Sequence, residues 1–160
     1  MESTQDAVGH AIAAHRDMPG ALLPLLHAVQ DAVGHIPADA IAQIAQALHL
    51  SRAEVHGVVS YYHHFRTQPA GQQVVQICQA EACQSMGADT LWNHACKYLE
   101  LDATQALHGA TTADQRITLQ PVYCLGLCSS SPALSINERV HARVGTERLV
   151  RLLDSARSAP

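Results

Sequence analysis

The stretch Val122-Tyr-Cys-Leu-Gly-Leu-Cys128 decides how the second half of this chain folds, together with the earlier stretch Cys78-Gln-Ala-Glu-Ala-Cys83. Each stretch holds two cysteines, and their spacing lets one loop turn both sulfurs toward a single site. A thiolate binds a metal only if its sulfur can face the metal, so this spacing predicts metal binding. Two such loops supply four candidate ligands, Cys78, Cys83, Cys124 and Cys128.

The spacing within each pair indicates which metal these cysteines bind. Zinc sites usually place two residues between paired cysteines, whereas here four and three residues separate them. The wider spacing favours a 2Fe-2S cluster, in which each iron takes two thiolates. Structural zinc held by four cysteines is the main alternative. Disulfides are a weaker one, because the segment from Met1 to Asp6 lacks the basic and apolar parts of a signal peptide. We therefore expect a cytoplasmic protein with reduced thiols.

The sequence also predicts the structural roles of Gly126 and Cys96. Gly126 lies between two candidate ligands, so we expect a tight turn with positive φ that can aim amide N–H groups at the sulfurs. The fifth cysteine, Cys96, lies in an apolar helical pattern with Leu91 and Leu99. It is expected to be a small buried side chain rather than a ligand. A nucleophilic role for Cys96 is a remote alternative, since no base can be identified for it.

Composition sets the class of protein. The chain has 160 residues, 48% of them hydrophobic, and a formal net charge of −4, so it can bury a core and presents no basic surface for nucleic acid. No apolar run approaches the ~20 residues needed to cross a bilayer, so no direct membrane contact is expected.

The adjacent His63 and His64 are expected to face solvent or form hydrogen bonds, because neighbouring helical side chains point about 100° apart.

The first part of the chain, residues 1–68, predicts a small bundle of four helices. Apolar residues recur there at helical spacing in four segments, and Ser51-Arg-Ala-Glu54 has the pattern of a capping box that begins the last helix. Most apolar side chains of this domain are expected in its core. This includes the group formed by Tyr61, Tyr62 and Phe65, although an exposed member of the group would be available to a partner.

A polar stretch, Thr67-Gln-Pro-Ala-Gly71, marks the expected boundary, and residues 72–160 form the second domain. Val74–Ile77 and Ile117–Tyr123 read as strands that each lead into a cysteine, with a helix after Cys83. A long polar loop precedes the second of these strands. A hairpin and a final helix complete the pattern, with strands expected at Ala133–Ile136 and Val140–Val144 and the helix around 149–156. The predicted fold class is α+β, with both cysteine loops at one rim of a small sheet.

At these residues the sequence resembles the thioredoxin-like 2Fe-2S subunit of NADH dehydrogenase and its relative, the gamma subunit of soluble NAD-dependent formate dehydrogenase. The resemblance extends from about Pro19 to Leu153. The sequence departs from the family pattern at Gln115, where a turn glycine is expected after Ala-Asp. This departure affects only the expected geometry of that loop. The segments most similar to the formate dehydrogenase branch are Gly20-Ala-Leu-Leu-Pro-Leu-Leu-His27, Arg52-Ala-Glu-Val-His-Gly57, Glu81-Ala-Cys83 and Val122-Tyr-Cys-Leu-Gly-Leu-Cys128.

The resemblance implies a thioredoxin-like fold in the second domain, with the family's cluster ligands at Cys78, Cys83, Cys124 and Cys128. It also implies a partner subunit that binds FMN and NAD and carries a further iron-sulfur cluster. In formate dehydrogenases a separate large subunit oxidises formate at a molybdenum or tungsten cofactor. The resemblance therefore implies an electron-transfer subunit with one 2Fe-2S cluster in an NAD-dependent formate dehydrogenase, which exchanges electrons with the FMN- and NAD-binding subunit and has no active site of its own. The alternatives are the equivalent subunit of NADH dehydrogenase or an NAD-linked hydrogenase and, more remotely, a zinc-stabilised interaction module.

Overall fold

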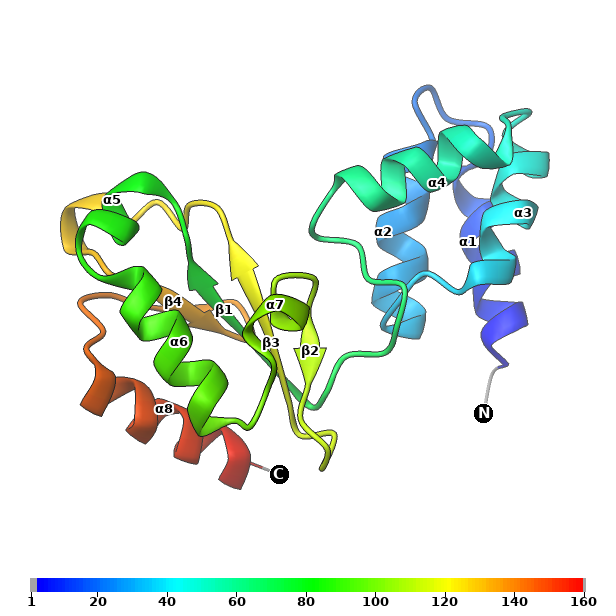
Figure 1. Ribbon diagram of the computed structural model, residues 1–160. Helices are drawn as coiled ribbons and strands as arrows, with labels where there is room; N and C mark the ends of the chain where they lie inside the picture. Colours follow the sequence, from blue (N-terminus) through cyan, green and yellow to red (C-terminus); the bar gives the residue numbers. More distant parts are fainter. Residues whose placement is uncertain (1–2, 160) are drawn as a thin grey trace. The chain divides into compact units, whose positions relative to one another are not determined.

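The computed structural model describes residues 3–159, which form two compact units. One unit contains the residues up to Pro69 and the other contains the residues from Ala70 onward. Each unit has its own hydrophobic core. We call them the helical unit and the sheet unit (Figure 1).

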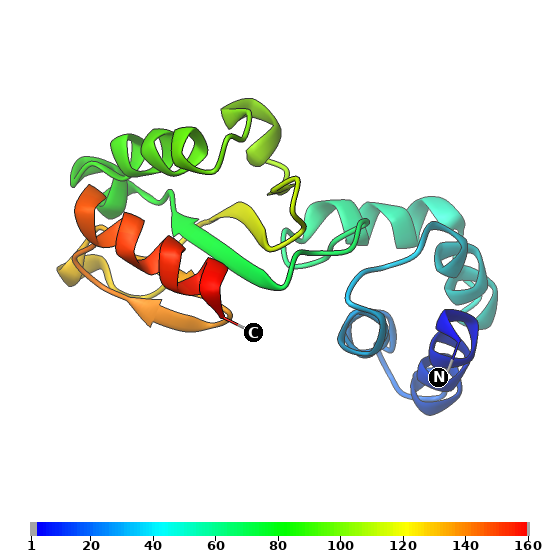
Figure 2. The ribbon, with the colours of Figure 1, turned by 90° about the horizontal axis from the view of Figure 1, so that it is seen from below.

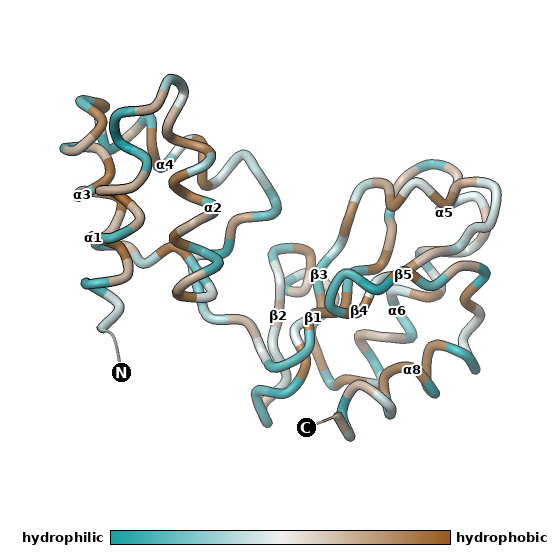
Figure 3. Tube along the Cα trace, turned by 180° about the vertical axis from the view of Figure 1, so that it is seen from behind, coloured by the Kyte–Doolittle hydropathy of each residue, from teal (hydrophilic) through white to brown (hydrophobic). Residues whose placement is uncertain are grey.

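The helical unit consists of four helices, α1 (Thr4–His15), α2 (Leu22–Val33), α3 (Ala38–Ala47) and α4 (Arg52–Tyr61). The predicted capping box is present at α4, where Glu54 N donates to Ser51 Oγ at 3.2 Å and Ser51 N donates to Glu54 Oε2 at 2.8 Å. Helix α2 ends at Gly34, whose φ of 85° is the left-handed conformation that glycine adopts without strain. Hydrophobic and hydrophilic residues alternate along these helices, as Figure 3 shows, and the hydrophobic ones form the core.

The aromatic group of the helical unit differs from the expectation. Phe65 is buried, but Tyr61 and Tyr62 are 76% and 43% exposed, so placing these two tyrosines in the core was wrong. The buried face of α4 is set by Val55 and Val59, one turn apart. Tyr61 follows Val59 by two positions, about 200° around the helix, and therefore faces away from the core. The helix ends before Tyr62, whose backbone is extended.

The sheet unit contains a five-stranded sheet in the order β2-β3-β1-β4-β5. The central strands β1 (Gln73–Cys78) and β3 (Ile117–Val122) are parallel, and the other pairings are antiparallel. The outer strands are β2 (Ala110–Thr111), β4 (Leu134–Ile136) and β5 (Arg139–His141). The helical segments are α5 (Glu81–Ser85), α6 (Ala88–Tyr98), α7 (Ala103–Ala106), the 3₁₀ turn η1 (Cys128–Ser130) and α8 (Thr146–Ser158).

The two faces of the sheet have different chemistry because side chains alternate along each strand. Apolar residues such as Val75, Ile77 and Leu119 are fully buried in a core shared with α6 and α8. These two helices contact each other and run side by side in Figures 1 and 2. Several of the alternate positions are polar and form hydrogen bonds, as where Ser135 Oγ donates to Gln76 Oε1 at 3.1 Å. The mixed architecture confirms the α+β fold class.

Three local features differ from the sequence expectations. The expected loop after Cys78 contains the short helix α5, and the long polar loop contains α7 and β2. The last strand covers Arg139–His141 instead of Val140–Val144, because Asn137 and Glu138, with φ of 45° and 68°, form the tight hairpin turn. Within residues 3–159, no helix is long and apolar enough to cross a membrane.

Candidate metal centre

The parallel pairing of β1 and β3 brings the two cysteine motifs to one edge of the sheet. Cys78 is the last residue of β1 and pairs with Val122, the last residue of β3. Because parallel strands end at the same edge, Cys124 follows only two residues beyond the partner of Cys78. Backbone hydrogen bonds hold the end of β1 in place at this edge. Gln79 N donates to Val122 O at 2.8 Å, and Cys78 N donates to Ala133 O at 3.0 Å.

The remaining two cysteines are placed by short helical segments at the same edge. Cys83 lies in α5, Cys128 begins η1, and α5 contacts η1. Ser131 connects these segments, since its hydroxyl donates to Cys128 O at 2.8 Å and lies 3.5 Å from Cys83 Sγ, in hydrogen-bond geometry. Three serines, Ser129-Ser130-Ser131, directly follow Cys128 in the sequence, but the sequence does not indicate this contact of Ser131. The contact depends on how the chain folds back between α5 and η1, and spacing alone does not reveal it.

The four cysteines differ sharply in exposure. Cys78 and Cys83 are each 2% exposed and pack with Ala88 and Ala133 in a small apolar cluster. Cys124 and Cys128 are exposed. The candidate site therefore has a buried pair of sulfurs on its inner side and a solvent-facing pair on its outer side.

The outer pair is shaped by a loop with two residues in the left-handed region. Gly126 has φ of 74°, which confirms the expected turn, and its N–H donates to Cys124 Sγ at 3.4 Å. Cys124 itself has φ of 101°, which the sequence did not indicate because a non-glycine residue seldom adopts that conformation. The Sγ atoms of Cys124 and Cys128 lie 3.9 Å apart, so both sulfurs turn toward the same place.

The cysteines of the site influence the ionisation of Cys128. The pKa of the Cys128 thiol is raised, first by its hydrogen bond with Cys124, then by the Cys124 charge and by burial, with smaller contributions from the charges of Cys83 and Cys78. Four thiolates in this arrangement repel one another unless positive charge lies between them. Soft thiolate donors in two pairs fit a 2Fe-2S core, which supplies that charge and takes two sulfurs at each iron.

Other candidate metal-binding side chains do not join the cysteines. Over residues 3–159, no group of three or more His, Cys, Asp or Glu side chains is placed to hold a single metal ion. The His64 ring instead lies beside His27, with 4.8 Å between ring centroids, and beside Phe65 at 5.8 Å. Cys96 lies on the buried face of α6 and is 3% exposed, as expected, and burial and the Asp102 charge raise the pKa of its thiol.

Comparisons with known proteins agree with this arrangement. The sequence profile of the family described as thioredoxin-like [2Fe-2S] ferredoxin matches residues 8–157. A subunit of NADH-quinone oxidoreductase from Rhizobium meliloti is 31% identical over 156 residues, which cover 97% of this chain and 89% of the relative. NADH-quinone oxidoreductase subunit 2 of Thermus thermophilus is 32% identical over 139 residues, which cover 86% of this chain and 74% of the relative.

A solved structure shows the same fold within a longer chain. The crystal structure of an NAD⁺-reducing [NiFe]-hydrogenase in the air-oxidised state matches 89% of this chain with a TM-score of 0.69 and 27% identity. The match spans only 24% of the hydrogenase chain. Fold, cysteine arrangement and sequence similarity together show that this chain belongs to the thioredoxin-like [2Fe-2S] ferredoxin family, with one 2Fe-2S cluster as its cofactor, and is a homologue of the NADH-quinone oxidoreductase subunits of that family.

Proposed function

We propose that this chain is an electron-transfer subunit of an NAD-linked oxidoreductase and that Cys78, Cys83, Cys124 and Cys128 hold its 2Fe-2S cluster. The observation that carries the proposal is the meeting of two cysteine pairs at the edge where β1 and β3 end together. A 2Fe-2S centre of this type exchanges single electrons at a potential typically near −400 mV for plant-type ferredoxins. That value suits exchange with a flavin, which in turn exchanges hydride with a nicotinamide.

The protein contributes ligation, burial and hydrogen bonding. Cys78 and Cys83 are withdrawn from water, whereas Cys124 and Cys128 are exposed and are the sulfurs that a docked partner would approach. The N–H of Gly126 points at the Cys124 sulfur and would stabilise negative charge there. Partner subunits carry out substrate oxidation. One of these partners is an FMN- and NAD-binding subunit with its own iron-sulfur cluster.

For the parent complex, we propose an NAD-dependent formate dehydrogenase, in which a large subunit with a molybdenum or tungsten cofactor oxidises formate. Support comes from the resemblance of segments such as Arg52–Gly57 and Val122–Cys128 to the gamma subunit of that enzyme. Similarity to subunits of NADH-quinone oxidoreductase and to an NAD⁺-reducing hydrogenase supports those two complexes equally well. Purification from the native source with identification of the bound subunits decides among the three.

The cluster assignment has its own experiment. We expect a brown protein with two irons and two sulfides per chain, whose colour bleaches with dithionite and whose reduced form gives an electron paramagnetic resonance signal. Replacing Cys124 by Ser should cause loss of most of the iron, because an alkoxide oxygen is a harder and poorer ligand for this core. A colourless protein that contains one zinc would instead establish a zinc-stabilised interaction module and overturn the proposal.

A further inference from the structure

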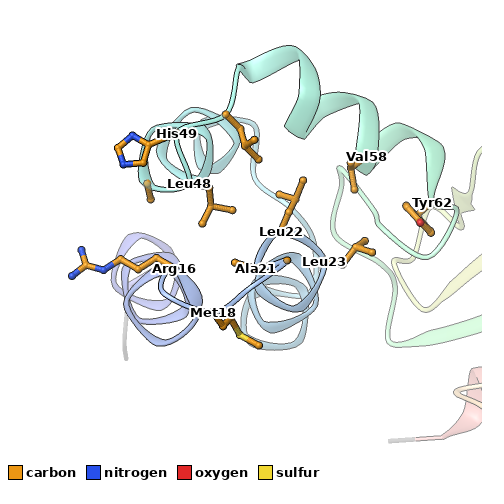
Figure 4. A pocket seen from close by; sticks show the side chains of 12 residues that line it. Arg16, Met18, Ala21, Leu22, Leu23, Leu48, His49, Val58 and Tyr62 are labelled. Carbon is orange, nitrogen blue, oxygen red and sulfur yellow. The ribbon is translucent and has the colours of Figure 1, made fainter.

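The helical unit has a pocket that the proposed function does not use, and aliphatic side chains form most of its wall. Figure 4 shows these side chains converging from α2, α4 and the end of α3. Ligand sites combine such a wall with a few precisely placed polar groups. Arg16 lines the pocket, but it already forms an ion pair with Asp17 at 3.6 Å. A buried polar group that faces a functional atom is found instead at the metal centre, where Ser131 lies beside Cys83.

The backbone holds Ser131 in place on both sides. Arg143 N donates to Ser130 O at 2.8 Å, and Val144 N donates to Pro132 O at 2.9 Å. These bonds tie the residues before and after Ser131 to the segment that follows the hairpin. Ser131 itself is 9% exposed. Its hydroxyl therefore has a fixed position and little access to water.

Two acceptor atoms lie within reach of Ser131 Oγ. The hydroxyl donates to Cys128 O at 2.8 Å, a bond to a nearby backbone carbonyl of the kind that serine often forms. That local bond does not account for the second contact, 3.5 Å to Cys83 Sγ, which is 48 positions away in the sequence. As a free thiol, Cys83 donates its proton to Ser131 Oγ in this contact. A thiolate ligand has no such proton, so the contact with a ligating Cys83 stays attractive only if the hydroxyl donates to the sulfur.

The Ser131 hydroxyl can change acceptors by rotation alone. Its proton turns about the Cβ–Oγ bond, so no heavy atom has to move. Hydrogen bonds to an ionised acceptor are roughly twice as strong as those between neutral groups, so a thiolate competes well with Cys128 O. Cys83 also packs with Ala88 and Ala133 in an apolar cluster. In such surroundings a hydrogen bond is electrostatically stronger than it is in water.

We propose that Ser131 is a positioning residue that raises the reduction potential of the 2Fe-2S cluster by donating its hydroxyl proton to the sulfur of Cys83. Reduction adds negative charge that the ligand sulfurs share, so this bond is stronger in the reduced state and favours electron uptake. Cys83 depends on a protein donor because it is buried, whereas Cys124 and Cys128 are exposed to water. This inference rests on the proposed function, because Cys83 influences the potential only as a ligand.

The test compares variants of the full chain that are purified with the cluster bound. Ser131→Ala and Ser131→Gly remove the hydroxyl, and Ser131→Thr keeps it. Ser129→Ala is the matched control, since Ser129 is an exposed serine of η1. Circular dichroism and iron content identify the variants that fold and retain the cluster. Redox titration then gives the potential of each.

At a fixed ambient potential, we expect the ratio of reduced to oxidised cluster to fall about threefold to tenfold in the two variants without the hydroxyl, where tenfold corresponds to about 59 mV for one electron. Ser131→Thr and Ser129→Ala should match wild type. The shift should be the same at low and high salt, because salt screens a buried dipole much less than a surface charge. The Fe–S stretching bands of wild type in resonance Raman spectra should shift on exchange into D₂O, and those of Ser131→Ala should shift less.

Three results would overturn the proposal, and they can be told apart. An unchanged potential in a variant that lacks the hydroxyl and keeps the cluster would remove the role of Ser131 and leave the proposed function intact. Loss of the cluster from both Ser131→Ala and Ser131→Gly, with retention in Ser131→Thr, would assign the hydroxyl to assembly of the site instead of to its potential. A wild-type chain that holds zinc in place of iron would overturn the proposed function and this inference with it.

Discussion

Gly71 and Gln115 approach so closely that a β-carbon on Gly71 would stand 3.0 Å from the carbonyl oxygen of Gln115. The same β-carbon would lie 3.0 Å from the carbonyl carbon of Arg116. Both obstacles are backbone atoms that are held in place, because Gln72 N donates to Gln115 O at 3.2 Å and Gln73 N donates to Arg116 O at 2.8 Å. Glycine at position 71 therefore allows β1 to begin beside β3.

Gly71→Ala should destabilise the sheet unit by about 1–3 kcal/mol, because the added methyl group must displace this backbone. Trp92 is the only tryptophan of the chain and is buried in the sheet unit, so its fluorescence during urea unfolding reports this unit. Gly9→Ala is the matched control. A β-carbon at Gly9 meets nothing within 4 Å and lies inside α1, so the Trp92 transition should not move. An unchanged transition in Gly71→Ala would contradict the close approach.

Gln115 itself occupies a conformation that favours glycine, with φ of 57°. A residue with a β-carbon is destabilised by roughly 1 kcal/mol in this conformation. Glycine avoids that strain but loses more conformational entropy on folding. Gln115→Gly should therefore stabilise the sheet unit by a net few tenths of a kcal/mol to about 1 kcal/mol. Gln105→Gly, inside α7, should do the opposite, since glycine weakens helices. Thermal unfolding of the two variants checks the opposite signs. A destabilised Gln115→Gly would mean that its side chain makes a contact worth more than the strain.

The sequence predicts some of these structural features and not others. Local rules were sufficient where the signal is local, as at the Ser51 capping box, the glycine turn at Gly126 and the strand that ends at Cys78. They failed for Tyr61, whose orientation depends on which face of α4 is buried, and for Cys124, whose positive φ no residue type indicates. Short elements such as α5 and β2 carry too few residues to show a period, and tertiary contacts define them.

His141 should give the sheet unit an acid-sensitive stability. Burial lowers the pKa of its imidazole below the ordinary value of 6.5, and the charges of Arg139 and Arg148 lower it further. The unfolded chain therefore binds the proton first, so stability is fully present above about pH 6.5 and falls as the pH drops through the lower folded pKa. His141→Gln should flatten this part of the profile of unfolding free energy against pH. NMR titration should show the imidazole pKa rising toward its ordinary value in Arg139→Gln, and an unmoved pKa there would exclude the charge effect.

Cys96 should be separable from the cluster by a simple substitution. Cys96 belongs to α6 and is buried among the apolar residues of the sheet core, whereas Cys78 and Cys83 belong to a separate small cluster. Cys96→Ala should leave iron content and the reduced-state paramagnetic signal unchanged, and should cost about 1 kcal/mol of stability for the small cavity. Its raised thiol pKa also predicts that Cys96 resists alkylation in the folded protein at neutral pH. A changed paramagnetic signal would show that the four ligands were misassigned.

The final prediction concerns Glu81, an exposed carboxylate in the first turn of α5, two residues before Cys83. A four-thiolate 2Fe-2S site has a net charge of about −2 when oxidised and gains one negative charge on reduction, so a nearby carboxylate opposes electron uptake. Solvent screening limits the effect at an exposed position. Glu81→Gln removes the charge at nearly constant size. We expect its potential to rise by tens of millivolts, where 59 mV corresponds to about 1.4 kcal/mol for one electron.

Two companion variants make the test of Glu81 specific. Gln84→Glu adds a carboxylate at an exposed position next to Cys83 and should lower the potential by a similar amount. Glu100→Gln removes an exposed charge just beyond the end of α6, a helix of 11 residues or about 16 Å, and should leave the potential nearly unchanged. Redox titrations of all three variants and wild type at one salt concentration provide the measurement. Equal potentials in Glu81→Gln and wild type would mean that water screens this charge completely, and a lower potential in Glu81→Gln would contradict the repulsion between the carboxylate and the added electron.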